Sequence, residues 1–200
     1  MRTMPRYDGT DCYTYPDSGV LKNKLGLRDQ AALDAFEADA TAVRLLELAE
    51  CPIQGRFDLE HLKAVHRHLF QDVYDWAGNL RTVDISKGSS RFGHCGMIES
   101  YLTQQLSRVS AENFLMDLSP EQFVGRLAYY MGEINAAHPF REGNGRVQRA
   151  FCAQLAERAG YFMDFSLVGR EEMYAAMIAS FRGDDGPLKA LLLRICTQME

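Results

Sequence analysis

The residues most able to do chemistry in this 200-residue sequence are gathered in one stretch, 138–149, which reads HPFREGNGRVQR. It holds a histidine at its start, a carboxylate at Glu142, two glycines around Asn144, and three arginines, of which Arg146 and Arg149 follow the glycines. Because Pro139 disfavours helical dihedral angles in the residue before it, a helix that arrives from the N-terminal side should end at His138. The glycines permit a tight turn whose backbone amides point at one spot, and a second helix is expected from near Asn144.

The two arginines that follow the glycines favour an anion site. Arg146 and Arg149 lie three positions apart, so they are neighbours on one face of the expected second helix. Positive charge at a helix N-terminus opposes the helix dipole, at about 0.3–1 kcal/mol per group, so a sequence selected only for stability would carry Asp or Glu there. A glycine turn, unpaired helix-terminal amides and two cations together are typical of a site for several phosphates.

The histidine and the carboxylate complete a candidate active site. Glu142 is of the type that binds Mg²⁺ together with substrate phosphates, and His138 is a candidate general base. The alternative is a helix–loop–helix corner with surface arginines and a buried, hydrogen-bonded histidine. That alternative would be preferred for any one of these residues alone, but their combination within twelve positions favours a site. The loop is not a Walker A motif, because no Lys-Ser or Lys-Thr pair follows the glycines.

The stretch resembles the signature of the Fic family, His-Pro-Phe-x-(Asp/Glu)-Gly-Asn-Gly-Arg-x-x-Arg, and matches it at every fixed position. The resemblance implies an all-α protein, a Fic-fold helical bundle with a small β-hairpin flap, which transfers AMP from ATP to a hydroxyl side chain of a target protein. It implies that His138 deprotonates this hydroxyl and that Glu142 binds Mg²⁺. It also implies that the phosphates are held by Gly143, Asn144, Gly145, Arg146 and Arg149. In-line phosphoryl chemistry of this kind depends on positioning and charge neutralisation.

The whole sequence fits a single domain, residues 1–200, with a core of ordinary size. Its net charge of −5 does not favour nucleic-acid binding. No apolar run is long enough to span a membrane, and the polar N-terminus is not a signal peptide. The five cysteines lack zinc or thioredoxin spacing, so we expect reduced thiols in a cytoplasmic protein. His61, His66 and His68 lack carboxylates at zinc-site spacing and are expected to be surface or core residues.

Apolar residues recur every three or four positions over most of the chain, which predicts a helical protein. Ser119, Pro120 and Gln122 have the pattern of a capping box at a helix start. Residues 1–28 are expected to form an irregular lead-in, because they contain several prolines and glycines. The expected helices span 29–50, 58–78, 97–112, 119–137, 144–160, 170–181 and 188–198.

Residues 81–94 predict a hairpin between two of these helices. The first half alternates and is rich in β-branched residues, a turn follows, and the last residues can return as a second short strand. A two-stranded hairpin is marginal by itself, so it must pack on the helices. The Fic resemblance implies a flap whose exposed edge binds the target protein by strand addition, through Ser86, Lys87, Gly88 and Phe92.

Gly145 distinguishes between the chemistries that Fic proteins perform. Family members that act as kinases have a bulkier residue there, so its presence implies AMP transfer. Transfer of UMP or phosphocholine, and removal of AMP, stay open because the motif contacts phosphates and not the base. A non-catalytic nucleotide-binding interaction module is the alternative of another class. It would be favoured if His138 or Arg146 were missing, and both are present.

Many Fic proteins carry an inhibitory helix with Ser/Thr-x-x-x-Glu-Gly/Asn, whose glutamate pairs with the second arginine of the signature. In this sequence Gly or Asn follows Glu only at Glu112 and Glu142, and the residues four positions earlier are Arg108 and His138. We therefore expect a toxin that is inhibited by a separate small antitoxin, whose glutamate reaches Arg149. The resemblance implies the ATPase subunits of bacterial type II topoisomerases as targets. A host-directed effector domain is the alternative, although we expect no further domain for secretion.

Overall fold

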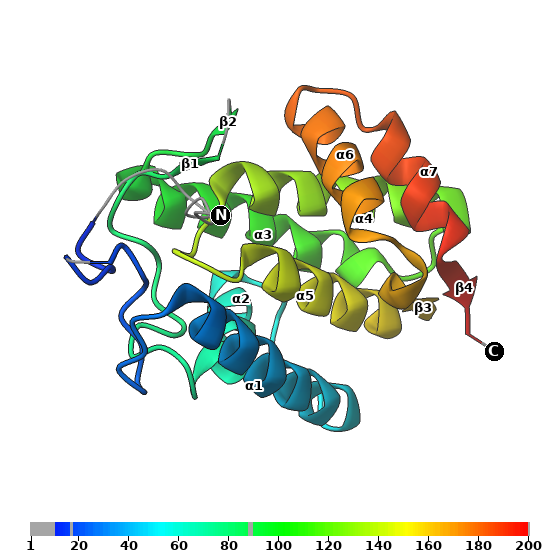
Figure 1. Ribbon diagram of the computed structural model, residues 1–200. Coiled ribbons are helices and arrows are strands. Elements are labelled where there is room, and N and C mark those ends of the chain that lie inside the picture. The colour runs from blue at the N-terminus through cyan, green and yellow to red at the C-terminus, as the bar shows by residue number, and fades with distance from the viewer. Residues whose placement is uncertain (1–10, 17, 88–89, 200) are drawn as a thin grey trace.

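The structure, a computed structural model, describes residues 11–16, 18–87 and 90–199. In these residues it has seven α-helices and two pairs of short antiparallel strands (Figure 1). The helices are α1 (Gln30–Glu50), α2 (Leu59–Phe70), α3 (Ile98–Ala111), α4 (Pro120–Ala137), α5 (Asn144–Arg158), α6 (Arg170–Phe181) and α7 (Gly186–Arg194). The strands are β1 (Ser86–Lys87), β2 (Ser90–Arg91), β3 (Tyr161–Met163) and β4 (Cys196–Gln198). The prediction of an all-α bundle with a small hairpin is confirmed.

Helix α4 is central in the bundle, because it packs against α3, α5, α6 and α7. Its apolar side chains at helical spacing are buried: Phe123, Leu127, Tyr130 and Ile134. Burial of each such large side chain contributes about 1.5–3 kcal/mol relative to exposure. The C-terminal end of α4, where segment 138–143 begins, is therefore held by the packed core.

Polar residues fix where two of the helices begin. Ser119 Oγ accepts a hydrogen bond from Gln122 N–H (3.4 Å), and Gln122 Oε1 accepts one from Ser119 N–H (3.1 Å), which completes the predicted capping box before Pro120. Asp58 caps α2 by accepting a hydrogen bond from His61 N–H at 3.0 Å. Each such cap is worth about 1 kcal/mol. The starts of α2 and α4 are therefore set by the local sequence.

The second predicted helix, expected to run to residue 78, is shorter than predicted. Helix α2 ends at Phe70, whose carbonyl accepts hydrogen bonds from the amides of Val73 and Tyr74, both at 3.0 Å. The chain then turns at Gly78, which has a φ of +87°, and the Gly78 N–H donates to His66 Nδ1 at 2.7 Å. Val73 and Tyr74 are buried. They lie in the non-helical segment after α2, although their spacing is that of a continued helix.

The hairpin predicted for 81–94 forms, but its ladder is shorter than expected. Strands β1 and β2 pair with Ser86 opposite Arg91 and Lys87 opposite Ser90. The residues before β1 are outside the ladder, because Arg81 turns inward and is buried.

Strands β3 and β4 form a pair that the sequence did not predict. They run antiparallel with Tyr161 opposite Gln198, whereas a helix was expected over 188–198. Gly160 ends α5 with a φ of +85°, and its carbonyl accepts a hydrogen bond from Met199 N–H at 2.9 Å. The sharp turn at this glycine lets the end of the chain pair with the residues that follow α5.

Segment 138–143 lies at the end of the bundle where the flap and the described part of the lead-in also lie (Figure 1). Two backbone hydrogen bonds join the flap to this end, from Arg81 N–H to Pro139 O and from Gly93 N–H to Ala136 O, each 2.9 Å. Segments far apart in the sequence therefore meet where the candidate site was predicted. Within the described residues no helix has the length and apolar character needed to cross a membrane.

Candidate active site

Left-handed backbone at two residues shapes the loop between α4 and α5. Helix α4 ends at His138, with φ of +47° and ψ of +62°, and His138 N–H donates to Ile134 O at 2.9 Å. Gly143, with φ of +82°, is the N-cap of α5. A non-glycine residue in this region costs about 1–2 kcal/mol, and such strain is concentrated at functional sites. The predicted helix end before Pro139 and the predicted start near Asn144 are confirmed.

Asn144 fixes the shape of this loop. Its Oδ1 accepts a hydrogen bond from Phe140 N–H at 2.9 Å, and its Nδ2 donates one to Phe140 O at 2.7 Å. Gly143 is pressed against α2, because a Cβ placed on it would lie 2.1 Å from Phe70 Cζ. The buried Asn144 amide thus serves the loop itself, and its role in phosphate binding stays a prediction.

His66 supports the same loop from α2. Its Nδ1 accepts the hydrogen bond from Gly78 N–H, so Nε2 carries the proton and faces Glu142 O at 3.2 Å. The ring stacks on Phe140 with 3.9 Å between ring centroids. Burial lowers the pKa of His66 to about 3, so the ring is neutral at physiological pH. The sequence placed His66 among surface or core histidines and did not predict this contact with the loop.

Arg81 is a buried clamp between α4 and the flap. Its guanidinium donates to the carbonyls of Val83 (2.6 Å), His138 (2.9 Å), Ala137 (3.1 Å) and Gly93. A cation is favourable at a helix C-terminus, where the last carbonyls lack helical partners. Arg81 therefore fixes the backbone of His138 relative to the flap. The sequence did not single out Arg81 as a site residue, since an arginine in an alternating run is usually exposed.

His138 faces the flap. Its ring stacks on Phe92, with ring centroids 3.8 Å apart and planes at 15°. Its Nδ1 lies 3.3 Å from Asn135 O, an arrangement that places the proton on Nδ1 and the lone pair on Nε2. Burial, together with the charges of Arg81 and Lys87, lowers the pKa of His138 to about 3. The imidazole is therefore neutral at pH 7, which is the form that a general base needs.

Arg146 is already neutralised by a carboxylate from α1. Its Nη2 pairs with Glu37 Oε1 at 2.5 Å, and its Nη1 donates to Thr41 Oγ1 at 3.1 Å. The guanidinium lies over the Phe70 ring, 4.7 Å from the ring centroid. Glu37 is 2% exposed and also accepts a hydrogen bond from the Tyr74 hydroxyl. The sequence did not predict this contact, because it joins residues 109 positions apart.

Arg149 carries the uncompensated positive charge of the site. It is partly buried, and in the part of the chain that the structure describes it makes no hydrogen bond or ion pair. Burial and the charge of Arg146 lower the pKa of Arg149. A Cβ on Gly145 would lie 3.4 Å from Arg149 Nη1, so glycine leaves the guanidinium uncrowded. A partly buried, unpaired cation is costly, and an anion bound here would relieve that cost.

Glu142 is the protein group most suited to a metal ion at this site. The residue is 6% exposed, and its Oε1 accepts a hydrogen bond from Gly143 N–H at 2.9 Å and lies 3.8 Å from Arg146 Nη2. Mg²⁺ is usually bound by one or two carboxylates, with substrate phosphates and water completing its coordination. A single carboxylate beside an anion-binding helix start therefore fits Mg²⁺.

The structure brings part of the predicted flap set to the site. Phe92 covers the candidate base and also meets Phe181 of α6 edge to face, with 5.9 Å between ring centroids. Ser86 and Lys87 form β1, so they lie in the hairpin as predicted, while Gly88 falls outside the described residues. Binding of a target protein by these residues stays a prediction.

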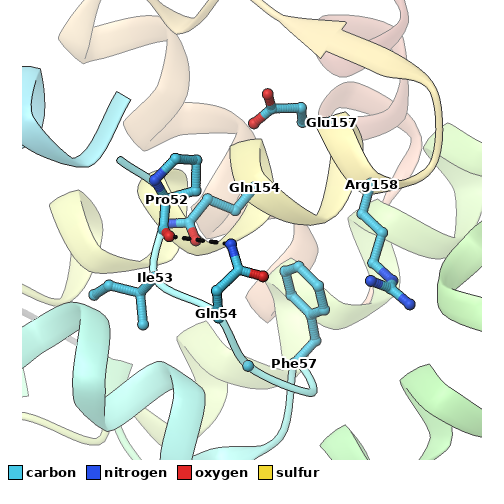
Figure 2. A pocket seen from close by; sticks show the side chains of 8 residues that line it. Pro52, Ile53, Gln54, Phe57, Gln154, Glu157 and Arg158 are labelled. Atoms are coloured by element: carbon cyan, nitrogen blue, oxygen red, sulfur yellow. Dashed lines mark hydrogen bonds between the residues drawn. The ribbon is translucent and has the colours of Figure 1, made fainter. Parts of the chain in front are cut away.

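A cavity of about 270 Å³ lies at the other end of α5 and is separate from this site (Figure 2). The segment between α1 and α2 lines one side of it, and Gln154 and Arg158 of α5 line the other. None of residues 138–149 lines this cavity. The residues predicted to bind phosphates are therefore outside this cavity.

Comparison with known proteins connects this geometry to a family. Residues 56–156 match the Fic/DOC family. The chain is 46% identical over 196 residues to the protein adenylyltransferase VbhT of Bartonella schoenbuchensis. These residues are 98% of this chain and 41% of that protein. It is 38% identical over 192 residues to the probable protein adenylyltransferase Fic of Salmonella typhimurium. These residues are 96% of this chain and 94% of that protein. The chain thus spans less than half of VbhT and nearly all of the Salmonella relative.

Solved structures of Bartonella proteins have the same fold. The N-terminal Fic domain of a VirB-translocated Bep effector from Bartonella quintana, with bound ADP, has a TM-score of 0.87 at 31% identity, over 94% of this chain and 95% of that one. BepC from Bartonella tribocorum, with bound AMPPNP, has a TM-score of 0.87 at 27% identity, over 94% and 97% of the two chains. The chain therefore belongs to the Fic/DOC family. Because its relatives are named protein adenylyltransferases, it is an enzyme of the nucleotidyltransferase class.

Proposed function

We propose that this chain transfers AMP from Mg-ATP to a hydroxyl side chain of a target protein. The observation that carries the proposal is one corner between two helices, in which the strained end of α4 presents His138 and the first turns of α5 carry Arg149, which has no partner among the described residues. The names of the relatives support AMP transfer, and the ADP and AMPPNP bound by Bartonella Fic domains support ATP as the substrate.

In the proposed reaction the target hydroxyl attacks the α-phosphorus of ATP, and pyrophosphate leaves. His138 Nε2 accepts the hydroxyl proton while the new oxygen–phosphorus bond forms and the bond to the β-phosphate oxygen breaks. The backbone of 143–145 and the guanidinium groups of Arg146 and Arg149 hold the phosphates and stabilise the charge on the departing pyrophosphate. Mg²⁺, when bound at Glu142, supplies further neutralisation of the phosphate charge.

The flap is the proposed contact for the target protein. An extended target segment adds as a strand beside β1, along Ser86, Lys87 and Gly88. Because Phe92 covers the imidazole of His138, the incoming hydroxyl displaces the Phe92 ring or enters at its edge. The position of the flap then determines which target residue reaches the base.

We also infer that the chain acts as a toxin in the cytoplasm and is inhibited by a small antitoxin. These 200 residues contain no Ser/Thr-x-x-x-Glu-Gly/Asn sequence. Arg149 lacks an acidic partner among the described residues, so a glutamate from a separate chain can pair with it. The ATPase subunits of DNA gyrase and topoisomerase IV are the proposed targets. A host-directed effector is the second candidate, because several similar structures are VirB-translocated Bartonella effectors.

Labelled nucleotides test the proposed chemistry. The purified chain is incubated with gyrase and topoisomerase IV ATPase subunits, or with cell lysate, and with ATP labelled at the α- or the γ-phosphate. We expect protein labelling from the α position only, and none with the His138→Ala variant. Labelling only from the γ position would indicate kinase chemistry and would refute AMP transfer. UTP and CDP-choline as donors test UMP and phosphocholine transfer, and binding of ATP without any transfer would support the non-catalytic alternative.

A further inference from the structure

Three side chains that can bind a metal ion converge at the base of the flap. Asp84 precedes β1, and His94 and Cys95 follow β2, so the chain leaves and re-enters the base of the hairpin at these residues. One candidate ligand atom from each side chain lies within 4.8 Å of the other two. In the described residues no other group of three such side chains is this close. None of the three belongs to the 138–149 loop.

Hydrogen bonds already orient all three side chains, including the Cys95 thiol, which donates to Thr82 O at 3.5 Å. The Cys95 N–H donates to Asp84 Oδ1 at 2.7 Å, so the carboxylate is fixed with its Oδ2 3.6 Å from His94 Nε2. On the far side of the imidazole ring, His94 Nδ1 accepts a hydrogen bond from Gly96 N–H at 3.2 Å. The side chains of Asp84 and His94 are 48% and 68% exposed, so an ion can reach them directly from solvent.

The geometry points to a Zn²⁺ site formed by Asp84 Oδ2, His94 Nε2 and Cys95 Sγ, and we propose that the flap binds this ion. Thiolate and imidazole ligands favour a borderline-soft ion such as Zn²⁺ over Mg²⁺ or Ca²⁺. Bonds of about 2.0–2.3 Å in a tetrahedron place ligand atoms about 3.3–3.8 Å apart. The carboxylate and the imidazole already have this separation. Cys95 Sγ has to approach them by up to about 1.5 Å and give up its hydrogen bond to Thr82 O, which a partly exposed side chain can do.

Binding of the ion changes protons and hydrogen bonds at the site in a balanced way. The Cys95 thiol releases its proton to solvent and binds as the thiolate. The neutral ring of His94 carries its proton on Nδ1 when Nε2 binds the metal, so the hydrogen bond from Gly96 is given up. Water fills the fourth position, because the site is open to solvent.

The consequence of this site is a flap that is closed at its base. Among the described residues the ladder of β1 and β2 has only the pairs Ser86–Arg91 and Lys87–Ser90, and at the base the two halves are joined by the hydrogen bond from Cys95 N–H to Asp84 and by the Arg81 guanidinium. An ion that joins Asp84 to His94 and Cys95 would link the two ends of the segment that carries Phe92. Zn²⁺ should therefore slow the opening of the flap.

Metal titration of the full chain tests the proposal. Metal-free protein is titrated with Zn²⁺ against a competing chelator dye, and with Co²⁺ as a spectroscopic probe of thiolate ligation and tetrahedral geometry. We expect one ion per chain and a thiolate-to-Co²⁺ charge-transfer band. Cys95→Ser and His94→Asn should weaken Zn²⁺ binding about tenfold or more and remove or shift this band. Cys51→Ser, which removes another exposed free thiol, is the matched control and should bind as the unmodified chain does.

Amide hydrogen exchange gives a second readout that does not depend on enzyme activity. Zn²⁺ should slow exchange in residues 84–95 of the unmodified chain and of Cys51→Ser, and should have no such effect in Cys95→Ser. The proposal is overturned if Cys95→Ser keeps the charge-transfer band, if Cys51→Ser loses affinity equally, or if exchange in the flap does not respond to Zn²⁺. Thermal unfolding of each variant without metal shows that these changes at exposed side chains leave the fold intact.

Discussion

Replacing Arg81 by lysine should loosen His138, the proposed base, from the flap without changing the net charge. Arg81 donates hydrogen bonds to four backbone carbonyls, and its side chain is fully buried. A lysine ammonium lacks the planar fork of a guanidinium and should leave about two of these carbonyls without a donor. Each buried, unsatisfied carbonyl costs about 1–3 kcal/mol, so Arg81→Lys should lower the free energy of unfolding by about 2–6 kcal/mol.

The same substitution should affect AMP transfer more than nucleotide binding. Arg81 bonds to the carbonyls of His138 and Gly93, and none of its hydrogen bonds involves Arg146 or Arg149. We therefore expect the Kd for ATP to change by less than about twofold, while kcat falls about ten- to a hundredfold because the base is misplaced.

Urea unfolding, binding of a fluorescent ATP analogue and transfer of α-phosphate label together measure these effects. Arg91→Lys is the matched control, because it makes the same change at an exposed arginine of β2 in the same hairpin. If Arg81→Lys had the unfolding midpoint and the transfer rate of Arg91→Lys, the assignment of Arg81 as a clamp would be refuted.

His138→Ala should keep the fold and the affinity for ATP and abolish AMP transfer, and transfer by this variant would exclude His138 as the base. Arg149→Gln should weaken ATP binding about tenfold or more. Because it removes an unpaired cation, it should also raise the unfolding free energy of the nucleotide-free protein by up to about 1 kcal/mol. Calorimetry with and without ATP measures both effects, and a large loss of stability would contradict this assignment. Gly143→Ala should cost about 2–4 kcal/mol, seen as a lower Tm, because its φ is +82° and a Cβ would lie 2.1 Å from Phe70 Cζ. The pKa of His66 is lowered from 6.5 to about 3 in the folded chain. Between these values the unfolded chain binds the additional proton, so His66 should lower stability below pH 6.5 by about 2 kcal/mol at pH 5, and His138, whose pKa is also lowered to about 3, should add a similar loss. His66→Gln should reduce this dependence in urea titrations, and an unchanged dependence would rule out His66 as one of its sources.

The corner between α4 and α5 could be predicted from the sequence because its causes are local. Pro139 restricts the residue before it, Gly143 permits the left-handed N-cap, and Asn144 bonds to a residue only four positions away. The capping box at Ser119 is equally local. Patterns of this kind operate over one or two helical turns, so the printed sequence contains all of the information that they need.

The contacts that hold the site residues in place could not be predicted, because they are long-range. His66 reaches the Glu142 carbonyl across 76 positions, and Arg81 reaches the His138 carbonyl across 57. Helical periodicity identifies the face that turns inward, but it does not say which polar residue crosses to another segment. For the same reason the predicted second helix was too long. Val73 is buried and has helical spacing, but it lies in a turn.

The carboxylate that balances Arg146 comes from outside the stretch that defines the family. Residues 56–156 match Fic/DOC, yet Glu37 belongs to α1, which ends before that stretch begins. A fragment that starts at residue 56 would hold the complete signature but would lose the carboxylate that pairs with Arg146 at 2.5 Å, and would leave Glu142, 3.8 Å from Arg146, to balance two neighbouring guanidinium groups at the same helix end. The unit that must be kept whole for nucleotide chemistry therefore extends upstream of the recognisable motif by at least one helix.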